Sequence, residues 1–476
     1  MWQIFRIRCA TRPDTHYPRG NRLPTRSSGQ IAQIVTRFAT ALLFGALLAA
    51  CDKSTPPPGP VVSTPPVAVT PPPSAPQAPL DQDLFLRPPH MSDQEPVRIA
   101  VLLPFKAQQN GVREVADALF NAAQLALFEF GNRDVLLIPK DTSGTPVGAA
   151  GAAREAMQEG AELILGPLFS QSVAVVAPIA AERRVPVIAF STDRNVAGNG
   201  VYLLSFLPEQ DVERIVDYAM LQGLTSFAAL VPQNEYGSRM GNALTQAVTA
   251  RAGEMKGIQS YPPRAEEMFE PARRLARYDV RKQALNAERA RLRAAGDPES
   301  LSRLRALENH DTIGDVPFQA VFVPAGGTEL RSAAPLLPYF DVDPRKVRFL
   351  GTGQWDDASL GREPSLVGGW FAAPPREAHD AFEARYARMF GATPPRIASL
   401  GYDAVSLASA LSRRPAHDRF SETILVHPDG FAGVDGIFRF LPDGRNERGL
   451  AVLEMSRNGP KVIDPAPASF VPAPTF

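Results

Sequence analysis

Small hydroxyl side chains follow two apolar runs in the first half of the chain. The stretch Ala161–Thr192 reads AELILGPLFSQSVAVVAPIAAERRVPVIAFST. An apolar run at 163–165 leads to Ser170, and a second run at 185–190 leads to Ser191. Because ligands bind outside the carboxyl ends of strands in an open parallel sheet, we expect both serines at the mouth of a binding cleft. The alternative interpretation is that the two serines cap helices.

Residue patterns typical of catalytic sites are missing from the sequence. It contains no GxSxG, HExxH, P-loop or GxGxxG motif, and its six histidines are scattered. The two cysteines, Cys9 and Cys51, exclude a disulfide framework and a thiolate metal site in the folded part. We therefore expect no enzymatic activity, no metal and no cofactor. Balanced charge, 50 basic against 50 acidic residues, gives no basis for a nucleic-acid partner.

An apolar segment near the start has the parts of a secretory signal. Phe38–Ala50 reads FATALLFGALLAA, follows Arg37 and precedes Cys51. It is too short to span a bilayer, which needs about 20 residues. The ending LAAC resembles the bacterial lipobox, which implies that Cys51 is diacylated on sulfur and becomes the mature N-terminus. The alternative is an ordinary signal peptide that contains a cysteine.

The segment before the mature chain is long for a signal peptide. We expect residues 1–50 to be removed, and translation to begin nearer Val35 than Met1. Asp52 resembles an inner-membrane retention signal, so the anchor is expected in either the outer or the inner membrane of a Gram-negative bacterium. The proline-rich residues 51–96 predict an extended, semi-rigid tether that spans on the order of 100 Å.

Apolar runs and helical patterns alternate along the rest of the chain. Such alternation predicts an α/β fold with parallel sheets flanked by helices. The pattern restarts at a helix over 208–222, which predicts two lobes with a cleft between them. The expected strands are 97–105, 135–138, 163–165, 185–190, 201–206, 227–231, 258–261, 320–324 and 347–351, and the other expected helices are 112–130, 148–159 and a segment ending at 250.

Two segments depart from this alternation. Residues 269–295 predict one long helix, and Asp297 with Pro298 predicts the start of a second helix that runs to about Leu307. We expect a helical hairpin inserted in the second lobe, whose charged faces are either solvated or a docking surface. Residues 430–462 predict a meander of antiparallel strands, because two turn signals flank an alternating apolar run.

Several motifs together resemble a known family. VRIAVLLPF, LILGPLFS, VPVIAFST, the NEYG turn and the GIFRFLPDG ending resemble type I periplasmic binding proteins of the branched-chain amino-acid class, over Val97–Ile463. The resemblance implies a two-lobed fold. The expected divisions are a first lobe of 97–207 plus 373–413, a second lobe of 208–372 plus 414–465 with its insert at 266–315, and a tail of 466–476.

A narrower resemblance concerns function. The lipobox, the tether, the helical insert and the DGRNERGLAVLEM ending most resemble penicillin-binding protein activators. Those lipoproteins bind and stimulate a peptidoglycan synthase, although the best-known members carry a helical-repeat domain where this chain has its tether. The resemblance implies a lipid-anchored periplasmic regulator of a synthase. The alternative is a receptor for amino acids or similar small polar ligands of an ABC transporter or sensor.

The family resemblance also implies binding residues. In that family, hydroxyls in the first lobe hold the ligand's carboxylate or amino group, and a tyrosine in the second lobe covers the ligand. The matching positions are Ser170, Ser191, Thr192 and Tyr236. Polar groups of the second lobe in Gly351–Asp357 add the candidates Gln354 and Asp356, and Asp356 is expected to meet an ammonium. The alternative is structural for each, such as a helix cap or a packed side chain.

Overall fold

A computed structural model describes residues 95–131 and 134–471. The expected signal peptide, Cys51, Asp52 and almost all of the expected tether lie outside the described residues, as do residues 472–476 of the expected tail. All of the described residues belong to one compact unit of the chain. Among the described residues, no helix has both the length and the apolar character to cross a membrane.

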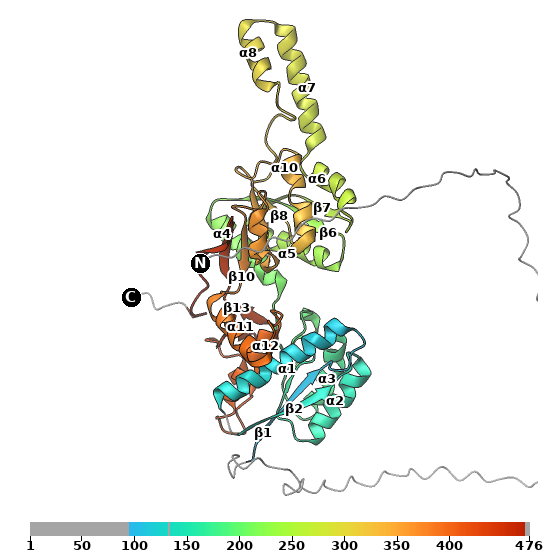
Figure 1. The fold of residues 1–476 in the computed structure, drawn as a ribbon, viewed down its shortest axis with the longest axis vertical. Helices are drawn as coiled ribbons and strands as arrows, with labels where there is room; N and C mark the ends of the chain where they lie inside the picture. Colours follow the sequence, from blue (N-terminus) through green and yellow to red (C-terminus); the bar gives the residue numbers. More distant parts are fainter. Residues whose placement is uncertain (1–94, 132–133, 472–476) are drawn as a thin grey trace, which may run out of the picture. The chain divides into compact units, whose positions relative to one another are not determined.

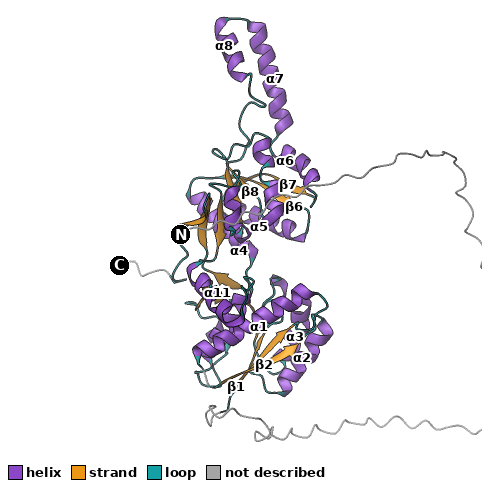
Figure 2. Cartoon of the chain, in the orientation of Figure 1, coloured by secondary structure: helices purple, strands orange, loops and turns teal. Residues whose placement is uncertain are grey.

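Five parallel strands form the sheet of the first lobe, in the order β2-β1-β3-β4-β5. Apart from the edge strand β2, their side chains are almost all buried, as expected for a parallel sheet that helices cover on both faces (Figures 1 and 2). The strands are β1 (Val97–Leu103), β2 (Val135–Asp141), β3 (Leu163–Leu165), β4 (Val187–Ala189) and β5 (Val201–Leu203). The helices are α1 (Asn110–Phe130), α2 (Pro146–Gln158), α3 (Ser170–Ala181), α11 (Glu377–Phe390) and α12 (Ala398–Leu411).

A close helix crossing ties the late helix α12 into the first lobe. Leu119 of α1 and Leu400 of α12 share one core cluster with the strands. A Cβ atom on Gly401 would lie 2.2 Å from the Leu119 carbonyl oxygen, so only glycine permits this approach.

Seven strands form the sheet of the second lobe, in the order β15-β14-β10-β9-β8-β6-β7. β14 pairs antiparallel with both of its neighbours, β10 and β15. All of the other neighbouring strands pair parallel. The strands are β6 (Ser226–Pro232), β7 (Glu254–Tyr261), β8 (Ala320–Phe322), β9 (Arg348–Gly351), β10 (Trp370–Ala373), β14 (Ala451–Ser456) and β15 (Gly459–Asp464). The helices are α4 (Pro208–Leu221), α5 (Glu235–Ala250), α6 (Phe269–Leu275), α9 (Gly327–Ala333) and α10 (Leu336–Tyr339).

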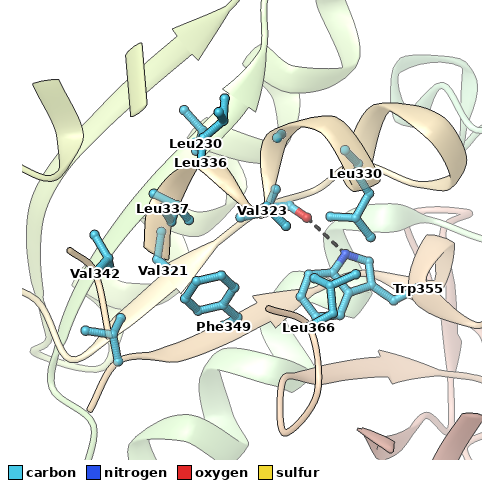
Figure 3. Packing of buried hydrophobic residues seen from close by; sticks show 14 of the residues in the cluster. Leu230, Val321, Val323, Leu330, Leu336, Leu337, Val342, Phe349, Trp355 and Leu366 are labelled. Carbon is cyan, nitrogen blue, oxygen red and sulfur yellow. Dashed lines mark hydrogen bonds between the residues drawn. The ribbon is translucent and has the colours of Figure 1, made fainter. Parts of the chain in front are cut away.

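The core of the second lobe surrounds Trp355 and Phe349 (Figure 3). Trp355 is fully buried, and its indole Nε1 donates a hydrogen bond to the carbonyl oxygen of Val323 at 3.1 Å. The indole therefore buries a large apolar surface without leaving its one polar atom unpaired.

The inserted hairpin consists of α7 (Tyr278–Ala295) and α8 (Pro298–Leu307), which pack side by side (Figure 1). The expected single helix over 269–295 is wrong, because Arg277 takes a left-handed conformation with φ 51° that separates α6 from α7. Before this break, Ala272 and Leu275 of α6 belong to the buried core, so the structural insert is shorter than 266–315.

The expected start of α8 is confirmed. The Asp297 carboxylate accepts a hydrogen bond from the backbone N–H of Ser300, with Pro298 in the first turn.

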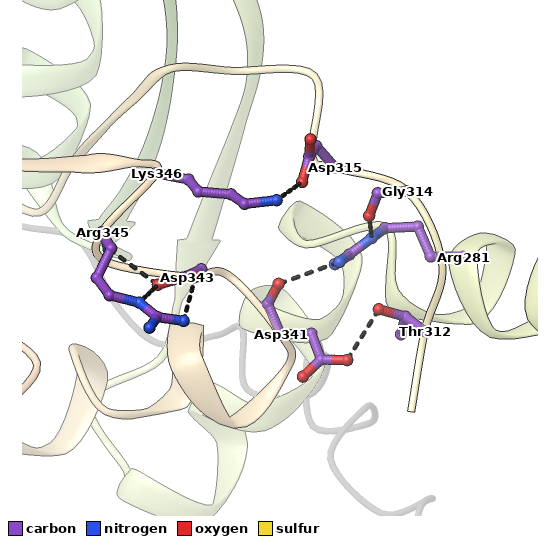
Figure 4. A network of polar contacts seen from close by, with 8 residues as sticks. All are labelled: Arg281, Thr312, Gly314, Asp315, Asp341, Asp343, Arg345 and Lys346. Carbon is purple, nitrogen blue, oxygen red and sulfur yellow. Dashed lines mark hydrogen bonds and ion pairs between the residues drawn. The ribbon is translucent and has the colours of Figure 1, made fainter. Parts of the chain in front are cut away.

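Polar contacts fix the base of the hairpin (Figure 4). The Arg281 guanidinium donates to the carbonyl oxygens of Gly314 and Asp341, at 3.0 and 3.1 Å. The Thr312 hydroxyl donates to the Asp341 carboxylate at 2.8 Å. These contacts join both ends of the inserted segment to the loop that follows α10.

The C-terminal strands divide between two sheets. β11 (Phe431–Gly433), β12 (Gly436–Phe440) and β13 (Asn446–Arg448) form an antiparallel sheet of their own, preceded by the short helix α13 (Glu422–Leu425). The expected meander is therefore split after β13, since β14 and β15 extend the sheet of the second lobe. Phe438 and Phe440 lie in the core of the first lobe, which differs from the expected placement of 414–465 in the second.

The chain crosses between the lobes three times. It crosses after β5, after β10 and after β13, because each of these strands is followed by an element of the other lobe. The expected α/β architecture of two lobes, with parallel sheets flanked by helices, is confirmed. The segments between the lobes bring residues that are far apart in sequence to one place.

Candidate functional site

A cavity of about 360 Å³ lies where the crossing segments meet. Its volume is in the range of small-molecule pockets. The wall is mostly apolar, with polar groups at a few points. The lining residues are Phe206, Leu207, Pro208, Gln210, Asp211, Tyr236, Thr352, Gly353, Gln354, Asp356, Ala373, Pro374, Arg396, Arg448 and Leu450.

Tyr236 reaches the cavity from the first turn of α5. The Asn234 side chain caps this helix by accepting a hydrogen bond from the Gly237 N–H at 2.8 Å. The Tyr236 hydroxyl lies 3.4 Å from the hydroxyl of Thr352. Burial raises the pKa of Tyr236 to about 12, so the side chain is a neutral hydrogen-bonding group at physiological pH.

The loop after β9 presents four lining residues, at positions 352–354 and 356, because Trp355 anchors it. A Cβ atom on Gly351 would lie 2.3 Å from the Trp355 ring, so glycine allows the ring to fold back against the strand end. The Thr352 hydroxyl accepts a hydrogen bond from the Gln354 N–H at 3.4 Å. Buried Trp355 thereby fixes the positions of Gln354, which is exposed, and Asp356, which is partly buried.

Two arginines neutralise Asp356. Its carboxylate oxygens lie 3.3 Å from Arg376 Nε and 3.2 Å from Arg396 Nη1. Burial raises the pKa of Asp356, and the charges of Arg376 and Arg396 oppose that rise. The carboxylate expected to meet a ligand ammonium is therefore already paired.

A buried charge cluster lies behind Arg396. Asp435 is fully buried, 2.7 Å from Arg396 Nη2 and 3.1 Å from His379 Nδ1. Although burial opposes ionisation, His379, Arg396 and Arg448 hold the pKa of Asp435 at about 2. Arg396 therefore links Asp356, on a loop of the second lobe, to a buried carboxylate of the first lobe.

Arg448 is a nearly buried guanidinium behind the cavity wall. Its Nε donates to the carbonyl oxygen of Ser205 at 3.2 Å, and the guanidinium lies 4.7 Å from the ring centre of Phe206 and 5.4 Å from that of Phe438. Burial lowers its pKa, and the nearby charges of two aspartates oppose this. Its terminal nitrogens make no hydrogen bond and have almost no accessible surface.

Asp211 is the remaining carboxylate of the cavity wall. Its Oδ2 accepts a hydrogen bond from the Gly353 N–H at 2.9 Å. Burial raises its pKa to about 7, while Gly353 and the charge of Arg396 lower it and Glu209 raises it. Among the described residues, no lysine, arginine or histidine nitrogen lies within the 4.0 Å of an ion pair with Asp211.

The structure brings some of the predicted residues together and leaves others apart. Tyr236, Gln354 and Asp356 line the cavity, whereas the three first-lobe hydroxyl residues, Ser170, Ser191 and Thr192, do not.

These three hydroxyl residues lie elsewhere in the first lobe. Ser170 is the first residue of α3 rather than its cap. The buried Ser191 hydroxyl accepts a hydrogen bond from the Asp193 N–H at 3.2 Å. The Thr192 carbonyl oxygen accepts one from Arg239 Nη2 at 3.3 Å, which is a contact between the lobes.

Sequence reasoning missed Asp211, Arg396 and Arg448. Asp211 follows Pro208 in the first turn of a helix, where an acidic residue is ordinary. The two arginines lie about 190 and 240 positions further along the chain, and nothing in their local sequence marks them. The restart of the strand–helix pattern at 208 was the available signal, because it locates a crossing between the lobes.

Comparisons with known proteins agree with the two-lobed fold. The family model described as "Periplasmic binding protein" matches residues 96–460. No curated protein matches the chain.

Solved structures share the fold at low sequence identity. One is a putative branched-chain amino acid ABC transporter protein from Rhodospirillum rubrum, with a TM-score of 0.60 and 16% identity over 77% of this chain and 100% of that one. Another is an ABC transporter substrate-binding protein from Sphaerobacter thermophilus, with a TM-score of 0.56 and 18% identity over 79% and 98%. A third, a solute binding protein from Rhodopseudomonas palustris in complex with 3,4-dihydroxy benzoic acid, has a TM-score of 0.51 and 17% identity over 80% and 99%. The matched family model covers most of the chain, and the protein belongs to the periplasmic binding protein family.

Proposed function

We propose that the protein is a receptor that binds a small organic ligand in the cavity between its lobes and presents it to a transporter or sensor. The observation that carries this proposal is the composition of the cavity wall. Three crossing segments and a loop of the second lobe contribute to it, so a ligand there would contact both lobes at once. Such a ligand favours the closed arrangement of the lobes, because it gains contacts from each.

The family supports this role. Membership implies an extracytoplasmic location and a fold used for binding rather than catalysis. Structural neighbours include ABC transporter binding proteins, one of them in complex with a dihydroxybenzoic acid. Ligands of that size suit a cavity of about 360 Å³.

Thermal unfolding of the purified full-length chain tests the proposal. The panel contains amino acids, aliphatic amines, and aliphatic and aromatic carboxylic acids. A ligand at about 100 times its dissociation constant stabilises the fold by about 2.7 kcal/mol, which raises the melting temperature by roughly 3 °C. A selective rise supports the receptor function, and a flat response across all four classes contradicts it.

Two variants show whether a stabilising ligand binds in the cavity, one that blocks the cavity and a matched control. Gln354 is an exposed lining residue, so Gln354→Trp inserts a ring into the cavity without removing core packing. Glu213→Gln, at an exposed position of α4 outside the lining, removes a charge elsewhere. A genuine cavity ligand loses its effect in the first variant and keeps it in the second.

The inserted hairpin favours a second candidate function, contact with a peptidoglycan synthase that the protein activates. Within α7 and α8, Leu285 and Leu292 are the only buried residues. Most of the surface of the hairpin is therefore available to a partner. The backbone of Ile313 donates to the carbonyl oxygen of Arg281 at 3.3 Å, which shows that the two ends of the hairpin meet.

A deletion of residues 282–311, closed by a short glycine linker, therefore removes the hairpin and leaves the lobe core in place. If the hairpin is the docking surface, binding to the purified synthase is lost while the thermal response to ligand is unchanged. Equal synthase binding by the deleted and intact proteins would contradict this candidate.

The proposed lipid anchor at Cys51 would hold either function at a membrane. Labelling with a radioactive fatty acid checks it, since label should appear on the intact chain and disappear in Cys51→Ser. Label retained in the variant would rule out this cysteine as the anchor. Fractionation of the labelled cells then distinguishes the inner from the outer membrane.

A further inference from the structure

Asp211 differs from the other carboxylates around the cavity because, among the described residues, no cation forms an ion pair with it. Asp356 has Arg376 and Arg396, and Glu209 has Arg239 at 2.6 Å. Asp211, in contrast, has one backbone N–H on Oδ2 and no ion-pair partner among the described residues.

The free oxygen of Asp211 faces usable space. Asp211 lines the cavity, and its Oδ1 is not among the buried polar atoms that lack a partner. A desolvated carboxylate without a cation is costly, so the site gains most from a ligand that brings a positive charge. The hydroxyls of Tyr236 and Thr352 line the same cavity and can orient such a group.

The rest of the cavity offers little to an anion. Both terminal nitrogens of Arg396 already contact aspartates. Those of Arg448 have almost no accessible surface, so a ligand does not reach them in this arrangement. The other walls come largely from apolar residues, namely Phe206, Leu207, Pro208, Ala373, Pro374 and Leu450.

We propose that the Asp211 carboxylate binds a protonated amine on a ligand whose remaining body is apolar, an inference that rests on the proposed receptor function. The amine nitrogen donates to Oδ1, and the apolar body lies against the wall opposite. A carboxylate elsewhere on the ligand would weaken binding, because it would lose hydration without meeting an available cation.

Three probes of nearly the same shape test this ligand class. Leucine carries an amine and a carboxylate, 3-methylbutylamine carries only the amine, and 4-methylpentanoate carries only the carboxylate. Calorimetric titration of the full-length protein should give the order 3-methylbutylamine, leucine, 4-methylpentanoate from tightest to weakest. Tighter binding of 4-methylpentanoate than of the amine would overturn the inference and leave the receptor function standing.

Variants of Asp211 assign the effect to this side chain. Asp211→Asn keeps an oxygen that can accept from Gly353 N–H, so we expect it to fold, and it should bind the amine at least about tenfold more weakly. Asp211→Glu keeps the charge and should retain part of the affinity. Glu213→Gln, on the same helix but outside the lining, should bind like the wild type. Unchanged amine affinity in Asp211→Asn would also overturn the inference.

The pH profile supplies an independent readout. The charged groups that act on Asp211 are Glu209 on its own helix and Arg396 in the loop just before α12, with the Tyr236 phenol nearby. With an Asp211 pKa of about 7, wild-type affinity for the amine should fall about tenfold between pH 8 and pH 6, whereas Asp211→Asn should show a flat profile. If no probe and no compound of the wider panel binds, the receptor function and this inference both fail.

Discussion

Replacing Asp211 by asparagine should stabilise the ligand-free protein at about pH 8 and change its stability little near pH 4. Burial raises the pKa of this carboxyl from 3.8 to about 7, despite the hydrogen bond from Gly353 and the charge of Arg396. Above this pKa the folded protein holds a carboxylate that would be better solvated in the unfolded chain. Asparagine removes that charge and keeps an acceptor for Gly353.

The magnitude follows from the pKa difference. A carboxyl with a raised folded pKa holds its proton more tightly in the folded state, so the free energy of unfolding falls as pH rises between the two pKa values. One pKa unit corresponds to about 1.36 kcal/mol, so the change from 3.8 to about 7 sets an upper bound of about 4 kcal/mol. Since Asp211 is partly accessible from the cavity, we expect a gain of about 2–4 kcal/mol at about pH 8.

Urea unfolding of both proteins at several pH values between about 4 and about 8 measures the difference. Burial also raises the pKa of Asp403 to about 7, but Asp403 is present in both proteins and its contribution cancels. Glu213→Gln controls for a change of net charge on the same helix. The reasoning is refuted if Asp211→Asn is less stable than the wild type at about pH 8, or if the difference between them does not vary with pH.

Three further predictions concern the parts that support the cavity. Arg396→Met should lower the free energy of unfolding, measured by urea unfolding, because it removes one of the cations that pair with buried Asp435. The loss should be limited to about 2 kcal/mol because His379 still pairs with Asp435. An unchanged free energy of unfolding would contradict the proposal that Arg396 links Asp356 to Asp435. Because Asp435 has its pKa lowered to about 2, its stabilising contribution is present above about pH 4 and should be lost as pH falls toward 2, which acid unfolding of the wild type against Asp435→Asn would reveal. Gly351→Ala should cost roughly 2 kcal/mol or more and shift the Trp355 fluorescence, since its Cβ would overlap the indole; an unshifted spectrum would show that the loop adapts.

The sequence was informative where local pattern dominates. The apolar run Leu163–Leu165 is β3 as expected, because a short buried strand needs no other signal. The expected helix over 269–295 failed because its periodicity continues through Arg277, whose left-handed conformation depends on the packing of α6 into the core. The final strands were assigned to one meander because turn residues do not reveal which sheet a strand joins.

The site was predictable only in part, for a related reason. Tyr236, Gln354 and Asp356, which were singled out with the family resemblance, line the cavity. Ser170 and Ser191, which the strand-end rule placed at a cleft, do not line it. Pairing cannot be read from a single sequence, and the role of Asp356 changes once Arg376 and Arg396 are beside it. Asp211 becomes notable only when its neighbours are known not to include a cation.

The threefold crossing of the chain has a consequence for the order of folding. The core of the first lobe needs Phe438 and Phe440, and the sheet of the second lobe needs Val452 and Leu453 beside β10. Neither lobe can therefore complete its core until nearly the whole polypeptide has been synthesised. An N-terminal portion that cannot complete its core early stays unfolded, which is the state in which a chain can be threaded through an export channel before it folds on the far side.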